Sequence, residues 1–177
     1  MAHKSMFRKG RPFLMHTIIR ILIAVGMLSP LLCGAENCAW LNAATAGGLL
    51  GGDVSMKVIH TNAADTTCEF LLRGSSGASI LQIAVHTMNA MHDEFRNYAL
   101  ECGNAQVALG GVGNEAIECL DSRSTPRTAK IISRVRERVF LLTWTTPAST
   151  ANDTPEVEQE MKDKLRNVAE QVAGSLF

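Results

Sequence analysis

No stretch of the chain stays apolar for the roughly 20 residues that a membrane-spanning helix requires. The longest apolar run, Ile21–Leu32, covers 12 of the 177 residues and is interrupted by Gly26, Ser29 and Pro30. A membrane anchor is therefore the less favoured interpretation of this run. Internal repeats and low-complexity segments are also absent, and a hydrophobic fraction of 46% argues against intrinsic disorder.

Acidic residues are missing from residues 1–35, which carry five basic ones. A basic start, a short apolar run and small residues up to Ala35 form the layout of a secretory signal peptide. We therefore predict a signal peptide over residues 1–35, cleavage after Ala35 and a secreted or periplasmic protein. Two alternatives stay open. Met15 is a second candidate start, and Cys33 is a candidate lipid-anchored residue, although residues 30–32 lack the small residue that lipoprotein processing favours.

The mature chain, residues 36–177, has the length of one domain with a substantial core. It holds 12 basic and 17 acidic residues, which gives a net charge near −5. We expect no stable membrane span once the leader is removed.

Cys-x2-Cys pairs are absent from the mature chain, which argues against a structural zinc site. Four cysteines remain after the leader: Cys38, Cys68, Cys102 and Cys119. An even number in an exported domain indicates two disulfides. Three pairings are possible, and we favour Cys38 with Cys68 and Cys102 with Cys119, because sequential pairing ties neighbouring elements together.

Hydrophobic periodicity predicts three helices, at residues 43–50, 88–102 and 155–176. Strands are predicted at residues 54–60, 68–73, 78–87 and 116–120, with a further pair over residues 129–145. The alternation of this last segment slips near Arg136, which favours a hairpin or a bulge there. The order α-β-β-β-α-β-β-β-α predicts an α+β fold, with an antiparallel sheet of about six strands packed against helices and two disulfides.

Four short motifs, in order, resemble small exported bacterial domains of the DUF3558-like family: Cys38-Ala39-Trp40-Leu41, Leu49-Leu50-Gly51-Gly52-Asp53-Val54, Cys68-Glu69-Phe70 and Gly111-Val112-Gly113-Asn114-Glu115-Ala116. The resemblance spans most of the mature chain. It implies a secreted or lipid-anchored envelope domain with an α+β fold and disulfides, and no catalytic residues carry over with it. The missing lipoprotein signal weakens the inference of lipid anchoring.

A glycine-rich segment offers a possible loop site at Gly111, Gly113, Asn114 and Glu115. Its spacing resembles a dinucleotide fingerprint, which requires a strand before it and a helix after it. Because residues 116–120 are predicted to form a strand, a structural loop is the favoured interpretation.

The segment Gly74-Ser75-Ser76-Gly77-Ala78 falls one residue short of a nucleophile elbow, because Ala78 stands where the elbow needs glycine. It is followed by a predicted strand and is interpreted as a hairpin turn. The mature chain has three histidines, His60, His86 and His92, and no pattern that indicates a catalytic triad.

Imidazole and thioether groups gather at His86, Met88, Met91 and His92, and such ligands suit copper in an oxidising compartment. The favoured interpretation is that the methionines begin the buried stripe of a helix. An exported metal-binding protein or enzyme that uses this region is the alternative function.

Half of the mature domain's basic residues lie within 16 positions: Arg123, Arg127, Lys130, Arg134, Arg136 and Arg138. Such a segment on an acidic domain is a candidate contact for an anionic envelope component or an acidic protein. Charges that protect exposed strands are the competing explanation. Export, the overall negative charge and the few nearby aromatic residues argue against nucleic acid.

The sequence as a whole predicts an exported, non-catalytic domain that binds a ligand or partner at the bacterial envelope. We assign it no cofactor, no metal and no catalytic residue.

Overall fold

The computed structural model describes most of the chain that follows the predicted leader. It covers residues 37–60, 62, 64–75, 77–89, 91–103, 106–121, 126–147 and 154–177, without the side chains of residues 91–93 and 121. The predicted signal peptide, Met15, Cys33 and the expected mature start Glu36 lie outside the described residues.

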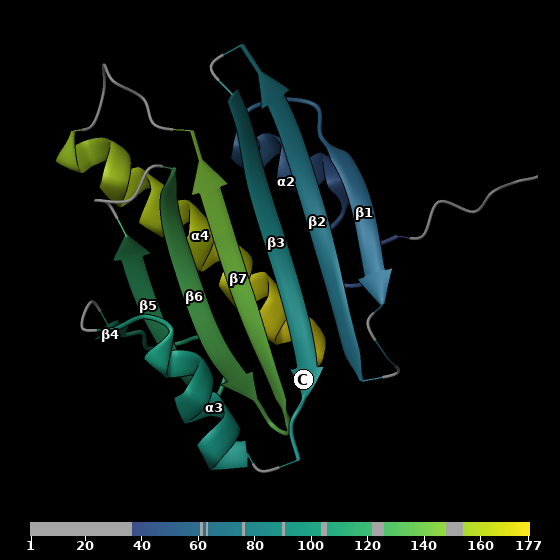
Figure 1. The fold of residues 1–177 in the computed structure, drawn as a ribbon, viewed down its shortest axis with the longest axis vertical. Coiled ribbons are helices and arrows are strands. Elements are labelled where there is room, and N and C mark those ends of the chain that lie inside the picture. Colours follow the sequence, from purple (N-terminus) through teal and green to yellow (C-terminus); the bar gives the residue numbers. More distant parts are fainter. Residues whose placement is uncertain are drawn as a thin grey trace, which may run out of the picture. The chain divides into compact units, whose positions relative to one another are not determined.

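The described strands form a single seven-stranded antiparallel sheet in the order β1-β2-β3-β7-β6-β5-β4 (Figure 1). They are β1 (Ser55–His60), β2 (Asp65–Gly74), β3 (Gly77–Thr87), β4 (Gln106–Ala108), β5 (Glu115–Asp121), β6 (Arg127–Val135) and β7 (Arg138–Thr146). The helices are α2 (Ala43–Leu50), α3 (Met91–Leu100) and α4 (Pro155–Leu176). In Figure 1, α2 and α4 lie behind the sheet and α3 lies in front of it. The predicted α+β class is confirmed.

The strand count differs from the prediction because β4 lies within residues 105–115, which the sequence predicts to be a connection. Three residues are too short for a periodic pattern, and this strand exists through its pairing with β5. The largest boundary differences are at the starts of β2 and α3. Strand β2 begins at Asp65, where polar residues pair with β3, and α3 begins at Met91 rather than at Met88.

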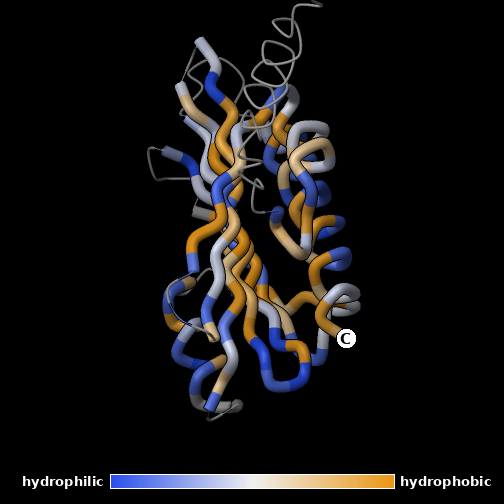
Figure 2. Tube along the Cα trace, turned by 90° about the vertical axis from the view of Figure 1, so that its right-hand side faces the viewer, coloured by the Kyte–Doolittle hydropathy of each residue, from blue (hydrophilic) through white to orange (hydrophobic). Residues whose placement is uncertain are grey.

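The main core lies between the sheet and the layer formed by α2 and α4; Figure 2 shows the C-terminal helix as a layer on one side of the strands. Helix α4 is buried along the predicted stripe, except at Val157, which is 40% exposed in the first turn. The buried α4 residues are Met161, Leu165, Val168, Ala169, Val172, Ala173 and Leu176. They face alternate residues of the strands, such as Phe70, Leu81 and Phe140, because successive side chains of a strand point to opposite faces.

A smaller core lies on the other face, where α3 covers part of the sheet. Met88 and Phe95 pack there with Ile132 of β6 and Val139 of β7. Met88 precedes the helix, and its backbone N–H donates to the carbonyl of Glu137 at 2.8 Å. The expected buried role of Met88 is therefore confirmed, although its expected place within a helix is wrong.

Both predicted disulfides are present. Cys38–Cys68 joins the segment before α2 to β2, and Cys102–Cys119 joins the turn after α3 to β5. The predicted β6–β7 hairpin is also confirmed, with its turn at Arg136 and Glu137. Within the described ranges, no helix has the length and apolar character needed to cross a membrane.

Candidate functional site

The face of the sheet that bears α3 is only half covered by the described elements. A row of mainly apolar residues crosses it from β1 to β5, as the strand registers show: Ile59, Thr67, Ala84, Leu141, Ile132 and Ile117. Directly paired residues share a face, and α3 packs over the last three of these positions. At the other end of the row, Ile59 is 36% exposed. Figure 1 shows the same division, with α3 in front of β5 and β6 and none of the described helices in front of β1 to β3.

We call the uncovered half the open face. Its residues come from β1, β2, β3 and β7 and are partly or fully exposed: Lys57, Ile59, Thr67, Glu69, Leu71, Ile80, Gln82, Ala84, Thr143 and Thr145. Leu71 and Ile80 are cross-strand neighbours, and Thr145 pairs with Ile80 on the far side. The open face therefore combines aliphatic and hydroxyl side chains from four adjacent strands.

The charges of the open face are matched within it. The amide of Gln82 donates to a carboxylate oxygen of Glu69 at 2.8 Å. Lys57, on the neighbouring strand β1, is the cross-strand partner of Glu69. Such pairing leaves little net charge in the middle of the surface. The face is therefore suited to contact a surface that is itself close to neutral.

One end of the open face carries an aspartate–histidine pair. Nδ1 of His86 lies 3.0 Å from Oδ1 of Asp65, and the two side chains are 25% and 27% exposed. The amide of Asn62 donates to the other oxygen of Asp65 at 2.6 Å, and the ring of Tyr98 from α3 stacks on His86 with centroids 5.5 Å apart. The pair therefore links β2, β3 and α3.

Hydrogen bonds, burial and charge shift the pKa values of Asp65 and Tyr98. The hydrogen bond from Asn62, followed by the one with His86, lowers the pKa of Asp65, so this carboxylate stays ionised at neutral pH. Burial, followed by the charge of Asp65, raises the pKa of Tyr98. A neutral imidazole whose Nδ1–H donates to a carboxylate has an unprotonated Nε2 that can accept a proton, which is the arrangement used by a general base.

The structure describes two of the four side chains in the predicted cluster of His86, Met88, Met91 and His92, namely His86 and Met88. Met88 is 6% exposed and packs in the small core, whereas His86 lies on the open face beside Asp65. The side chains of Met91 and His92 lie outside the described residues. Among the described residues, no group of three or more His, Cys, Asp or Glu side chains is placed to hold a metal ion.

The predicted basic segment is divided by the fold. Lys130 and Arg134 point to the α3 side of β6, where Lys130 pairs with Glu101 at 2.8 Å and Arg134 pairs with Glu115. Arg136 lies over the ring of Phe177, 5.7 Å from its centroid, and Arg138 is exposed at the start of β7. Arg127 begins β6, and Arg123 lies outside the described residues. The described part of the segment therefore supplies cations to several places rather than to one patch.

The predicted loop site has a structural role. Asn114 donates its backbone N–H to the carbonyl of Arg134 at 2.7 Å and accepts from the backbone N–H of Arg136 through its side chain at 2.6 Å. Gly113 has a φ of +64° and touches the backbone of β6, and Glu115 holds Arg134. Strand β5 follows directly, as expected, so the helix that a dinucleotide site requires is missing at this position.

A cavity of about 690 Å³ lies beside α2, on the side of the sheet away from the open face. It is lined mainly by small residues: Ala43, Ala44, Gly47, Gly48, Gly51, Gly52, Asp53 and Val54. A lining with a single charged side chain gives little chemical basis for recognising a polar ligand.

Sequence reasoning did not single out the open face as a site. The alternation of β3 does place Ile80, Gln82 and Ala84 on one side of their strand, but it cannot show which side the helices cover. Comparison of the chain with family models, curated proteins and solved structures gives no match. The resemblance to DUF3558-like domains therefore stays a hypothesis, and the case for a function depends on the open face.

Proposed function

We propose that this protein is an exported binding domain that contacts another protein through the open face. One observation carries the proposal: helices cover one side of the sheet, whereas the other side keeps aliphatic and threonine side chains partly exposed across four strands. Contiguous surfaces of this kind commonly mark interaction sites.

A protein suits this surface better than a small molecule does. Small ligands bind in concave sites that enclose most of their area, whereas protein partners cover about 800 Å² through many shallow contacts. The open face offers side chains from adjacent strands, with Glu69 and Gln82 already hydrogen-bonded to each other. The polar groups of the middle row are matched by one another and aliphatic side chains flank them on both sides, which gives a mixed, nearly neutral surface of the kind that protein interfaces use.

Export is part of the proposal. It is supported by the signal-like leader in the sequence and by two disulfides, which persist in oxidising compartments. An envelope or extracellular protein is therefore the expected class of partner.

Site-specific photo-crosslinking in the native cell tests the contact surface. A photoreactive amino acid is placed at Thr143 on the open face, at Asn167 on the outer side of α4, or at Arg138 beside the β6–β7 turn. We expect a discrete crosslinked species from Thr143 and none from Asn167, because only the open face is proposed to meet the partner.

Arg138 tests the competing idea that the basic segment contacts an anionic component or an acidic protein. Crosslinks from Arg138 and none from Thr143 would show that the partner contacts the basic segment and not the open face. Crosslinks of equal yield from all three positions would indicate nonspecific collisions and contradict the proposal.

The pairing of Asp65 and His86 favours a second candidate, an exported enzyme in which His86 acts as a general base. This candidate predicts hydrolysis of ester or peptide substrates by the purified domain, lost in His86→Gln and reduced in Asp65→Asn. Equal turnover by the wild type and His86→Gln would remove it.

A further inference from the structure

The two disulfides lie in different surroundings. Cys38 and Cys68 are 9% and 0% exposed and belong to the main core between the sheet and the helices. Cys102 lies at the surface end of α3 and is partly exposed, while its partner Cys119 is 7% exposed. A dithiol therefore reaches the sulfur of Cys102 more easily than either sulfur of the buried pair.

The described side chains of helix α3, which begin at residue 94, bury little apolar area against the sheet. Its described buried side chains are Phe95 and Ala99, each 9% exposed, whereas α4 buries seven residues. Hydrophobic stabilisation scales with buried apolar area, so the described side chains of α3 contribute much less of it than those of α4. The stacking of Tyr98 on His86, near the end of strand β3, adds one contact.

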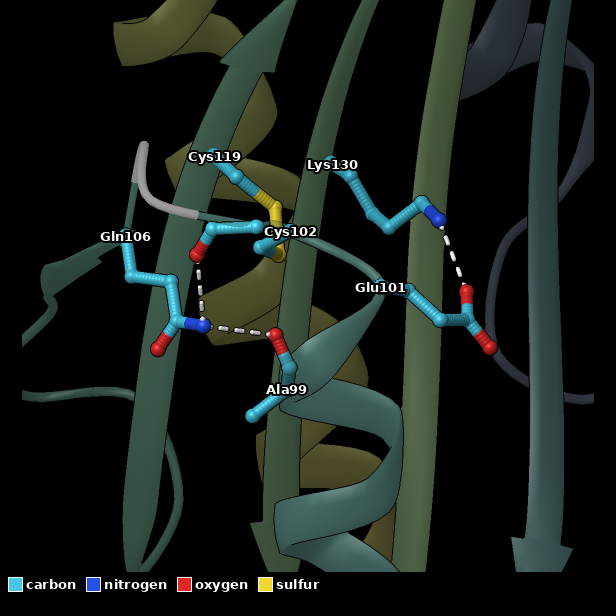
Figure 3. Close-up of a disulfide and its surroundings, with 7 residues drawn as sticks. Ala99, Glu101, Cys102, Gln106, Cys119 and Lys130 are labelled. Atoms are coloured by element: carbon cyan, nitrogen blue, oxygen red, sulfur yellow. Dashed lines mark hydrogen bonds and ion pairs between the residues drawn. A yellow bond between two sulfur atoms is a disulfide. The ribbon is translucent and has the colours of Figure 1, made fainter.

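Several polar contacts of the described C-terminal part of α3 lie around the disulfide, as Figure 3 shows. The ammonium group of Lys130 lies 2.8 Å from Glu101, whose side chain is 47% exposed. The amide of Gln106 donates to the carbonyls of Ala99 and Gly103 at 2.8 and 2.9 Å. Exposed pairs of this kind contribute little on their own, because water competes for the same groups.

We propose that the Cys102–Cys119 disulfide is a redox-controlled clasp that holds α3 on the sheet and releases it on reduction. The reductant is a dithiol, whose thiolate attacks Sγ of Cys102 and expels the Cys119 thiolate. Its second thiol then attacks the mixed disulfide, releases Cys102 and leaves the reductant as a disulfide. Two electrons pass to the protein, and the two cysteines end as thiols after taking up two protons.

Release uncovers a defined apolar surface. Ile132 and Val139 are fully buried under α3, with Ile117 and Leu141 beside them. Leu141, Ile132 and Ile117 continue the apolar row that begins at Ile59 on the open face, and Val139 lies next to this row. Opening the clasp therefore roughly doubles the length of this row that faces solvent, from its positions on β1, β2 and β3 to its positions on all strands from β1 to β5. This effect does not depend on which partner binds the open face.

Graded reduction of the folded, oxidised domain tests the clasp. Samples are treated with increasing dithiothreitol, alkylated and mapped by peptide mass spectrometry, and their hydrogen exchange is measured in parallel. We expect Cys102 and Cys119 to become alkylated at a reductant concentration at least about tenfold lower than Cys38 and Cys68. In that state, exchange should accelerate at least about tenfold in residues 94–103, while β2, β3 and β7 keep their protection.

The double variant Cys102→Ser/Cys119→Ser should show the same local exchange without any reductant, with Cys38→Ser/Cys68→Ser as the matched control that leaves α3 protected. If either variant fails to fold, the graded reduction of the wild type still gives the answer. Reduction of Cys38–Cys68 first, an α3 that stays protected after its own disulfide opens, or loss of protection across the whole sheet would each overturn the clasp.

Discussion

Gly113 shows how a single residue sets the contact between the glycine-rich loop and β6. A Cβ added at this position would lie 2.5 Å from the carbonyl oxygen of Arg134 and 2.6 Å from Oγ of Ser133. Its φ of +64° also lies in the left-handed region that side chains disfavour. Loop and strand are then joined by Ser133, whose hydroxyl donates to the carbonyl of Val112 at 3.1 Å.

We predict that Gly113→Ala lowers the free energy of unfolding by about 2 to 4 kcal/mol, because it adds a backbone clash to an unfavourable φ. Gly111→Ala is the matched control. Its φ is +86°, but a Cβ added there would come no closer than 3.9 Å to a side-chain nitrogen of Arg166, so we expect a loss of about 1 kcal/mol from the backbone alone. Urea denaturation measures both, and equal losses would argue against the clash.

Glu118 is the second informative residue, because it points from β5 toward α4. Its Oε1 is buried without a hydrogen bond, and burial raises the pKa of this carboxyl despite the nearby Lys162 and Arg166. Both cations have other partners, Glu158 and Glu170. A raised pKa means that the folded state binds the proton more tightly than the unfolded chain does. Stability therefore falls as the pH rises from the ordinary glutamate pKa through the raised one, and then levels off.

Glu118→Gln should accordingly be more stable than the wild type at pH 7, because the amide removes the cost of burying a charge. The difference should shrink below about pH 4, where the wild-type carboxyl is protonated in both states. Urea denaturation at pH 7 and at pH 3.5 measures this change. A stability difference that is the same at both pH values would show that the charge of Glu118 is not responsible.

Individual elements of this domain are held by different means. Helix α4 is held by a long stripe of buried side chains. Helix α2 is short, and the disulfide Cys38–Cys68 links the segment before it to strand β2. Helix α2 begins with a side-chain cap, in which Asn42 accepts from the N–H of Thr45 at 2.8 Å, and ends at Gly51 in the left-handed conformation. With only Ala46 buried in the helix itself, α2 depends on this disulfide.

We predict that Cys38→Ser/Cys68→Ser lowers the free energy of unfolding by roughly 3 to 4 kcal/mol, because the disulfide closes a loop of 30 residues in the unfolded chain. The loss should be global, since both cysteines lie in the main core. Denaturation followed by tryptophan fluorescence and by circular dichroism should give coincident transitions. A loss below about 1 kcal/mol would show that packing alone holds α2.

At the scale of the whole molecule, the domain has one well-covered side and one half-covered side. The net charge of the mature chain is near −5, and several of its bases are paired with acids, as Lys130 is with Glu101 and Arg134 is with Glu115. The neighbouring acids therefore partly cancel the long-range electrostatic field of the basic segment.

We predict that protein recovered from the envelope or the medium begins at Glu36, because the basic start, the apolar run and the small residues around Ala35 direct cleavage there. Intact-mass analysis of the exported protein checks both the cleavage site and the two disulfides, which lower the mass by four hydrogens. A species that keeps Cys33 with an attached lipid would contradict this start and indicate an anchored protein.

The sequence by itself was sufficient for the class of fold and the three helices, because these depend on local patterns. It left three disulfide pairings possible, and the favoured sequential pairing is the one that the structure has. The stripe of α4 and the hairpin near Arg136 follow from side-chain periodicity within one segment. Strand β4 could not be predicted, because its three residues are ordered by pairing with β5.

The open face could not be predicted from local sequence patterns either, because it depends on which elements pack together. Alternation separates Ile80, Gln82 and Ala84 from the other side of β3, but only the packed structure decides that α2 and α4 cover that other side. Likewise, the run of basic residues is visible in the sequence, whereas its partners Glu101 and Glu115 come from other elements and were found only in the fold. Periodicity is a property of one segment, while coverage and charge pairing are properties of how segments meet.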